Sequence, residues 1–327
     1  MSPVNSRIAV LTSGGDSPGM NAAVRAAVRA GVNTGLEMFG VRHGYKGLIA
    51  GDVLRLGARE VGGILERGGT ILGTSRCEAF RTEAGQAQAV RRLEALRIGG
   101  LIIIGGNGSQ AGAYALTEHG VRVVGIASTI DNDLAGSDVT LGATTALDVA
   151  LEAIDRLRVT ASAHGRVFLV EVMGRKCGYL ALLAGIAGGA EAIVIPEEEQ
   201  SPEDVATAIR AAYQRGKSHA VVIVAEGARH DADALAHYFT EHAERLGFEL
   251  RITKLGHVQR GGAPHVFDRI YASLLGAAAV EHLRAGSHGV LLGIVGGQIT
   301  ATSLAALGGQ HKPLDPRFVH LAHVLAQ

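Results

Sequence analysis

Short apolar runs alternate with longer amphipathic stretches from one end of the chain to the other. Each run is continuously apolar, which is typical of strands that are covered on both faces of a parallel sheet. The runs are Ile8–Leu11, Leu101–Ile104, Val121–Ile126, Val167–Val172, Ala192–Ile195, Ala220–Ala225 and Val290–Val295. This alternation predicts an α/β protein with doubly wound, mainly parallel sheets, in three-layer, Rossmann-like domains.

The stretches between the runs have helical spacing. They cover residues 21–32, 111–119, 141–159, 202–215, 233–246 and 267–284. In the stretch 141–159, one apolar face carries Leu147, Leu151 and Ile154. A second, acidic stripe consists of Asp148, Glu152 and Asp155. We interpret this stripe as a solvated helix face, because acidic side chains are usually exposed.

Chain length and charge limit the number of domains and the classes of ligand that we expect. A chain of 327 residues predicts two domains at roughly 150 residues each. A boundary is expected near residue 140, where Gly136 and Ser137 precede a long helix. Lys plus Arg equals Asp plus Glu, 31 against 31, so no bulk charge attracts nucleic acid or an anionic membrane. Aromatic residues make up only 4%, which argues against a stacking surface for single-stranded nucleic acid.

The cysteines and the apolar run lengths indicate a cytoplasmic protein. Cys77 and Cys177 show neither zinc spacing nor a disulfide framework, which suits a reducing compartment. Residues 1–7 lack the features of a signal peptide. No apolar run reaches the ~20 residues that a membrane-spanning helix needs. We therefore expect no membrane association.

Two glycine-rich turns follow predicted strands. The first, at residues 11–21, contains Gly14 and Gly15 and leads into a helix after Pro18. The second, Gly105 to Ser109, follows the strand 101–104. Glycines let a backbone approach a phosphate closely, and a helix start offers free amide donors, although such turns also serve simple geometry. The second turn matches neither a Walker A loop nor a full dinucleotide fingerprint.

A third polar segment, residues 128–133, follows the strand 121–126 and contains two carboxylates, Asp131 and Asp133. One carboxylate can accept a proton from an attacking hydroxyl, and the other can help to hold magnesium. A plain Asx turn would also use these residue types.

Basic residues in glycine-rich contexts or near predicted strand ends add phosphate-binding capacity. They are Arg76, Arg166, Arg175, Arg251, His257 and Arg260.

Together these segments resemble the bacterial ATP-dependent 6-phosphofructokinase family, from Ile8 to about Val295. The most specific strings are Leu-Thr-Ser-Gly-Gly-Asp at 11–16, Pro-Gly-Met-Asn at 18–21, Arg-Gly-Gly-Thr at 67–70, Thr-Ile-Asp-Asn-Asp at 129–133, Val-Glu-Val-Met-Gly-Arg at 170–175 and Gly-His-Val-Gln-Arg-Gly-Gly at 256–262. The resemblance implies a kinase that phosphorylates the 1-hydroxyl of fructose 6-phosphate. It also implies a nucleotide domain at 1–140 plus 258–300 and a sugar-phosphate domain at 141–257 plus 301–327.

The resemblance also implies roles for individual residues. The ATP-binding positions are Gly15, Arg76, Cys77, Gly106, Asn107, Gly108 and Ser109. The sugar-phosphate positions are Thr129, Ile130, Asp131, Met173, Gly174, Arg175, Glu226, His257 and Arg260. Asp131 would accept the proton of the hydroxyl, with catalytic support from Thr129, Arg175 and Arg76. Arg166 and Arg251 would reach the substrate of a neighbouring subunit in a homotetramer.

Further implied ligands are an effector and magnesium. Residues that match or lie near an effector site for a nucleotide such as ADP, or for phosphoenolpyruvate, are Arg25, Arg29, Arg59, Arg158, Glu191, Arg215 and Lys217. Surface charge on helices would look the same. Mg²⁺ would bridge the ATP phosphates, with Asn107 and Asp133 as the candidate protein ligands. Asn107 stands where the family usually has Asp, so metal binding would depend more on the nucleotide phosphates and on Asp131 or Asp133.

Two positions bear on the phosphoryl donor. Ser128 stands where ATP users usually have Gly and pyrophosphate users have Lys, and Gly108 stands where pyrophosphate users have Asp. Neither side chain is bulky and charged, which favours ATP. Cys77 replaces a usual aromatic beside the adenine. The alternatives are a pyrophosphate-dependent phosphofructokinase, an NAD or lipid kinase relative, and a non-catalytic sensor of sugar phosphate.

Overall fold

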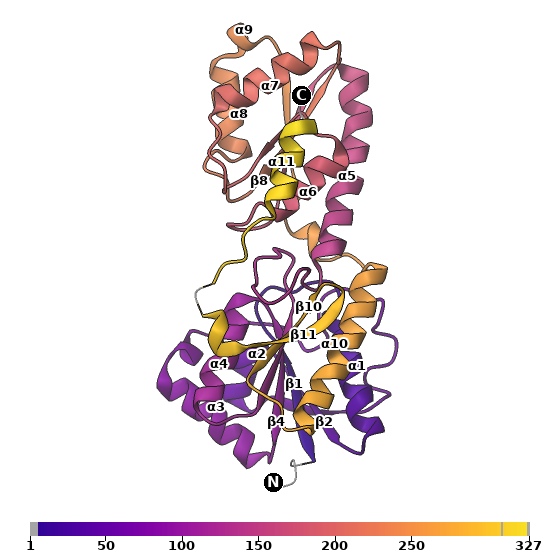
Figure 1. Cartoon of the computed structure of the whole chain (residues 1–327), viewed down its shortest axis with the longest axis vertical. Coiled ribbons are helices and arrows are strands. Elements are labelled where there is room, and N and C mark those ends of the chain that lie inside the picture. Colours follow the sequence, from indigo (N-terminus) through magenta and orange to yellow (C-terminus); the bar gives the residue numbers. More distant parts are fainter. Residues whose placement is uncertain (1–5, 309, 326–327) are drawn as a thin grey trace. The chain divides into compact units, whose positions relative to one another are not determined.

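The computed structural model describes residues 6–308 and 310–325. The chain divides into two compact units (Figure 1). The first unit contains Met1–Thr145 and Arg260–Lys312, and the second contains Ala146–Gln259 and Pro313–Gln327. Residues 301–308 and 310–312, expected in the sugar-phosphate domain, belong to the first unit instead. The reason is that β11 (Gln298–Ser303) pairs with β10 (Val290–Val295), and His311 bridges to Leu134.

The first unit is built on a seven-stranded sheet in the order β11-β10-β5-β4-β1-β2-β3. The remaining strands are β1 (Arg7–Thr12), β2 (Glu37–Val41), β3 (Val53–Leu56), β4 (Gly100–Gly105) and β5 (Val123–Ala127). The inner strands are parallel, and only β3 and β11 at the two edges are antiparallel to their neighbours. Parallel pairing brings the carboxyl ends of β1, β4 and β5 to one edge of the sheet.

Alternating residues of β1 build a core on each face of this sheet. Ile8 and Val10 face a core with α1 (Met20–Asn33) and α10 (Val266–Arg284), which pack side by side (Figure 1). Ala9 and Leu11 face a second core formed with α2, α3 and α4. These helices are α2 (Gly44–Ala50), α3 (Glu83–Ala95) and α4 (Asn107–Glu118). Coverage on both faces explains the continuous apolar runs and confirms the predicted three-layer α/β class.

The second unit has a four-stranded parallel sheet in the order β7-β8-β6-β9. Its strands are β6 (Val167–Val172), β7 (Ala192–Val194), β8 (Ala220–Ala225) and β9 (Leu250–Lys254). α7 (Pro202–Gln214) and α8 (Ala232–Glu241) share a core with one face. α6 (Tyr179–Gly188) covers the other face, where a Cβ at Gly185 would lie 2.5 Å from the Ile193 side chain.

Shorter elements complete the two units. The other helices are α5 (Ala143–His164), α9 (Ala243–Leu246) and α11 (Pro316–Leu325), which packs on α6. The 3₁₀ helices are η1 (Glu78–Arg81), η2 (Gly256–Gln259) and η3 (Leu304–Leu307). The acidic stripe of α5 is exposed, as predicted. No helix among the described residues is both long enough and apolar enough to cross a bilayer.

The start of α5 is held by a buried carboxylate that the sequence patterns did not reveal. Asp268 of α10 is 2% exposed and accepts hydrogen bonds from the amides of Gly142 at 2.8 Å and Thr145 at 3.0 Å. The hydroxyls of Thr144 and Thr145 donate to the same carboxylate. By accepting these hydrogen bonds, the Asp268 carboxylate satisfies amides at the start of α5 that have no partner within the helix.

Candidate active site

The first glycine turn leaves β1 and enters α1, as predicted. Gly14 has a φ of +86°, a conformation that glycine adopts without strain. Two side chains from distant segments hold this turn. Thr74 Oγ1 donates to the Gly14 carbonyl at 2.6 Å, and Arg260 Nη1 donates to the Asp16 carbonyl at 2.9 Å. The structure therefore places Arg260, predicted at the sugar phosphate, against the turn at Gly15 and Asp16.

The second glycine turn leaves β4 and forms the amino end of α4. Gly106 is the N-cap and no side chain caps this end, so the first amides of the helix are available to an anion. A Cβ at Gly108 would meet no atom of residues 6–308 or 310–325 within 4 Å, so the space beside this residue is open in the described structure. The buried hydroxyl of Ser109 has no hydrogen-bond partner among the described residues. These features fit a bound phosphate group.

The third segment follows β5 and is tightly braced. Asn132 has a φ of +51°, and its Oδ1 accepts from the Thr140 amide at 2.9 Å. Thr140 Oγ1 donates to the Thr129 carbonyl at 2.6 Å, and Thr129 Oγ1 accepts from the Asp131 amide at 3.2 Å. Asp131 is only 2% exposed and Ile130 is fully buried. The bracing fixes the backbone from which the Asp131 carboxylate projects.

The three turns contact one another at the carboxyl edge of the sheet. Ser17 and Ser128 join the first and third turns through a buried hydroxyl pair at 2.7 Å. Asn107 Nδ2 donates to the Asp133 carbonyl at 3.4 Å. A Cβ at Gly106 would lie 3.2 Å from Thr129 Cβ. Sequence reasoning predicted each turn separately, and the fold brings them together because β1, β4 and β5 are neighbours.

The predicted nucleotide residues Arg76 and Cys77 lie on a loop that precedes η1. Arg76 is exposed, and Cys77 is partly buried at the N-cap of η1. Nearby, Phe80 of η1 stacks on Tyr45 with ring centroids 4.0 Å apart. Tyr45 donates its hydroxyl to the Ser109 carbonyl at 2.5 Å, and burial raises its pKa, so it remains a neutral donor. Tyr45 thereby ties α2 to the first turn of α4.

In the second unit, several predicted residues gather at the carboxyl ends of β6, β8 and β9. Arg175 has a φ of +55°, and its amide donates to Glu226 Oε1 at 2.8 Å. The Gly174 amide donates to the same oxygen at 3.3 Å. Gln259, which sequence reasoning missed, accepts from the Met173 amide at 2.8 Å. This bond ties η2, which carries the exposed His257, to the segment of Arg175.

The other two predicted sugar-phosphate arginines lie at the opposite edge of this sheet. Arg166 immediately precedes β6, and Arg251 is the second residue of β9. Both are attracted by one carboxylate. Arg166 Nε donates to Glu249 Oε2 at 2.8 Å, and Arg251 Nη2 lies 3.6 Å from that oxygen. The strand β6 separates these arginines from Arg175 by six residues, roughly 20 Å at ~3.3 Å per residue.

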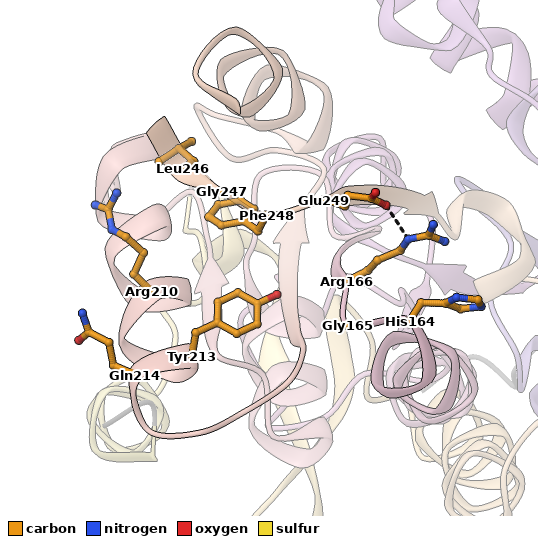
Figure 2. A pocket seen from close by; sticks show the side chains of 10 residues that line it. All are labelled: His164, Gly165, Arg166, Arg210, Tyr213, Gln214, Leu246, Gly247, Phe248 and Glu249. Atoms are coloured by element: carbon orange, nitrogen blue, oxygen red, sulfur yellow. Dashed lines mark hydrogen bonds and ion pairs between the residues drawn. The ribbon is translucent and has the colours of Figure 1, made fainter. Parts of the chain in front are cut away.

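A pocket of about 620 Å³ lies at this amino edge. Figure 2 shows the Arg166–Glu249 pair, with His164 nearby, across from the rings of Tyr213 and Phe248. Burial raises the pKa of Tyr213, and the charge of Glu191 adds to this effect. Arg210 also lines the pocket, but it pairs with Glu203 at 2.7 Å. The pocket includes none of the three turns of the first unit.

The predicted effector residues divide between the two units. Arg25, Arg29 and Arg59 belong to the first unit. In the second unit, Glu191 is 5% exposed and accepts from Lys217 Nζ at 2.6 Å and from the Val221 amide at 2.6 Å. Arg158 lies beside Gly189, and its buried Nε and Nη2 have no partner among the described residues. Arg215 lies two residues before Lys217.

A metal site made of protein side chains alone has no support. The described residues contain no group of three or more His, Cys, Asp or Glu arranged to hold a metal ion. Asn107 and Asp133 are nevertheless neighbours, and amide and carboxylate oxygens are ligands that magnesium accepts. The arrangement fits a cation that is held chiefly by nucleotide phosphates and only assisted by the protein.

The family model and the curated relatives that match this chain carry the same family description. The family model Phosphofructokinase matches residues 7–283. The chain is 50% identical over 321 residues to ATP-dependent 6-phosphofructokinase 1 of Thermus thermophilus, with 98% of this chain and 99% of that protein covered. It is 49% identical over 321 residues to ATP-dependent 6-phosphofructokinase of Brevibacillus brevis, with the same 98% and 99% covered.

A solved structure shares the fold. The crystal structure of Pichia pastoris phosphofructokinase in the T-state matches with a TM-score of 0.86 and 38% identity. The match covers 92% of this chain and 35% of the Pichia chain, which is much longer.

Proposed function

The chain belongs to the phosphofructokinase family, and on that premise we propose how its residues divide the work of the reaction. The enzyme transfers the γ-phosphate of ATP to the 1-hydroxyl of D-fructose 6-phosphate, giving fructose 1,6-bisphosphate and ADP. The transferring phosphoryl group carries spread negative charge, so the protein chiefly positions the reactants and neutralises charge.

Asp131 is the proposed base that accepts the proton of the sugar 1-hydroxyl. The observation that carries this assignment is its place: a 2% exposed carboxylate in a braced turn, beside two glycine turns suited to phosphate. Asn132 and Thr140 keep its backbone from moving as the proton transfers. The hydroxyl of Thr129 accepts a hydrogen bond from the Asp131 amide, and the same hydroxyl would orient the moving phosphoryl group.

The donor side would use the first two turns and two arginines. The amides at the start of α4 and the close approach at Gly15 suit the ATP phosphates. Arg76 and Arg175 would stabilise charge on the moving phosphoryl group. The open space beside Gly108 leaves room for a nucleotide phosphate. Mg²⁺, when bound, would neutralise the nucleotide phosphates, and the oxygens of Asn107 and Asp133 would help to hold it.

The basic residues of the sugar-phosphate set would bind the 6-phosphate. His257 and Arg260 would do so, with Arg260 anchored through Nη1 and its other N–H groups available. Met173, Gly174 and Glu226 would shape the sugar site near Arg175. Binding the distant phosphate aligns the reacting oxygen and lowers the entropic barrier.

Arg166 and Arg251 would serve a neighbouring copy of the chain. They lie at the edge of the second unit's sheet opposite to Arg175, farther away than one sugar phosphate can span. A substrate that contacts Arg175 of one copy would therefore receive these arginines from another copy. This requirement supports a homo-oligomer, and by analogy with the family we propose a homotetramer.

Regulation and location are further parts of the proposal. Arg158, Glu191 and Lys217 gather in the second unit. Two buried nitrogen atoms of Arg158 have no hydrogen-bond partner within the described part of the chain, which suits an anionic effector such as ADP or phosphoenolpyruvate. Arg215 would join them, and Arg25, Arg29 and Arg59 would contribute from the first unit. We place the enzyme in the cytoplasm, where its two thiols stay reduced.

The replacement Asp131→Asn tests the central assignment. The amide keeps the shape of the side chain but cannot accept the proton, so kcat should fall by about 10²–10⁴ while both KM values change little. Asp155→Asn on the exposed face of α5 is the matched control and should keep full activity. Full turnover by the Asp131 variant would exclude this carboxylate as the base.

A further inference from the structure

One buried amide lies where the second and third turns leave the sheet. Gln110, the fourth residue of α4, is 2% exposed. Its Nε2 donates to the carbonyls of Gly105 at 3.0 Å, Ile126 at 3.2 Å and Ile103 at 3.3 Å. Gly105 ends β4 and Ile126 is the next-to-last residue of β5. One amide group thus joins α4 to both strand ends.

The surroundings are shaped for this side chain. A Cβ at Gly125 would lie 2.1 Å from Gln110 Oε1, so any side chain at position 125 would displace the amide. Oε1 is buried and has no hydrogen-bond partner among the described residues. The reverse orientation would set this oxygen against three carbonyl oxygens, so the amide has only one acceptable orientation. Burying the Gln110 amide leaves its Oε1 without a hydrogen bond, which costs free energy of folding. Packing alone does not explain why a glutamine stands here.

The strand ends that Gln110 joins lead directly into the reacting groups. Gly106 follows Gly105 and caps α4, whose first amides face the donor phosphates in the proposed function. Ser128 follows β5, and its amide donates to the Gly105 carbonyl at 3.2 Å, the same oxygen that Gln110 contacts. Asp131 lies three residues farther along.

We propose that Gln110 is a positioning residue, which sets the separation between the phosphate-binding start of α4 and the turn that carries Asp131. This inference rests on the proposed roles of that turn and of Asp131. Gln110 touches no reacting atom, and it acts through the strand ends. Because a small misplacement of reacting groups slows a phosphoryl transfer strongly, the loss of this amide should lower kcat rather than weaken substrate binding.

The first test is Gln110→Met, which keeps the length of the side chain but has no donor. We expect kcat to fall by about 10- to 100-fold, with the KM values of ATP and fructose 6-phosphate unchanged. Gln88→Met, on a partly exposed position of α3, is the control and should match the parent enzyme. Parent-like kcat in the Gln110 variant, or a loss confined to the KM values, would overturn the proposal.

The second test is Gln110→Glu, which also serves if the methionine variant does not fold. A carboxyl group facing three carbonyl oxygens can donate only when it is protonated, and burial raises its pKa. The ratio of its kcat to that of the parent enzyme should therefore rise as the pH falls. A ratio that is independent of pH would contradict the donor role.

Combining Gln110→Met with Asp131→Asn separates this inference from the assignment of the base. If Gln110 acts by placing the Asp131 turn, it should cause little further loss once the carboxylate is gone, because residues that act as a unit are not additive. An equal loss in both backgrounds would refute the positioning role while leaving Asp131 as the base. An active single variant at Asp131 would remove the assignment of the base itself.

Discussion

The guanidinium of Arg260 occupies the space that a side chain at Gly15 would need. A Cβ at Gly15 would lie 2.5 Å from Arg260 Nη1, which donates to the neighbouring Asp16 carbonyl at 2.9 Å. The two positions are 245 apart in the numbering, Gly15 against Arg260, yet both belong to the first unit. The glycine therefore serves close packing with an arginine as well as the approach of a phosphate.

Gly15→Ala should displace the guanidinium of Arg260 and reduce the space for a phosphate at the first glycine turn. We expect the KM values of ATP and of fructose 6-phosphate both to rise by about tenfold, since about 1.4 kcal/mol of lost binding gives that factor. Steady-state kinetics with each substrate varied in turn measures both values. Gly261→Ala is the control, because a methyl group there would meet none of the residues that the structure describes within 4 Å. A KM for fructose 6-phosphate that stays unchanged would show that Arg260 does not serve the sugar.

Asn107→Asp should change the magnesium requirement. The added carboxylate beside Asp133 gives the cation a second charged ligand, so half-maximal rate should need less free Mg²⁺ at saturating ATP. The control is Asn33→Asp at the exposed end of α1, which adds the same charge elsewhere. Identical magnesium titrations for the parent and the Asn107 variant would exclude a metal role for this position.

Ser128→Lys should strongly impair the use of ATP. Ser128 is fully buried and pairs with Ser17, so a lysine side chain at this position would displace neighbouring groups of the first and third turns. We expect kcat/KM for ATP to fall by more than about 100-fold, from steric exclusion and disrupted packing. Ser128→Gly should keep the use of ATP and lose only about 1 kcal/mol of stability with the hydroxyl pair. Full activity of the lysine variant with ATP would contradict this account.

Arg166→Ala and Arg251→Ala should each raise the KM of fructose 6-phosphate with little change in the KM of ATP. The decisive measurement is complementation between copies. When Arg166→Ala and Asp131→Asn chains are unfolded together and reassembled, some sites combine the intact Asp131 of one copy with the intact Arg166 of another. Activity should then exceed the sum of the two separate variants. No gain in the mixed oligomers would mean that the arginines do not cross between copies.

The central strands were predictable because their burial on both faces leaves a continuous apolar run. β1, β4, β5, β6, β8 and β10 were all visible in this way. β2, β3, β9 and β11 were not among the predicted runs. β3, β9 and β11 lie at sheet edges with exposed residues interspersed, and β2, although an interior strand, includes the half-buried Glu37 and Phe39. The three turns of the first unit were predictable for a related reason, because each directly follows a buried strand and contains glycine, asparagine or aspartate.

Local pattern therefore determined the class of fold, the positions of the three turns and, through its specific strings, the family. Only the tertiary structure decided that Gln110 joins two strand ends, that Glu226 and Gln259 hold the segment of Arg175, and that Arg166 and Arg251 lie at the far edge of their sheet. The physical reason is that these relations depend on hydrogen bonds and strand order between segments far apart in the sequence. A periodic pattern of apolar residues records which face of an element is buried, but it does not record which partner buries it.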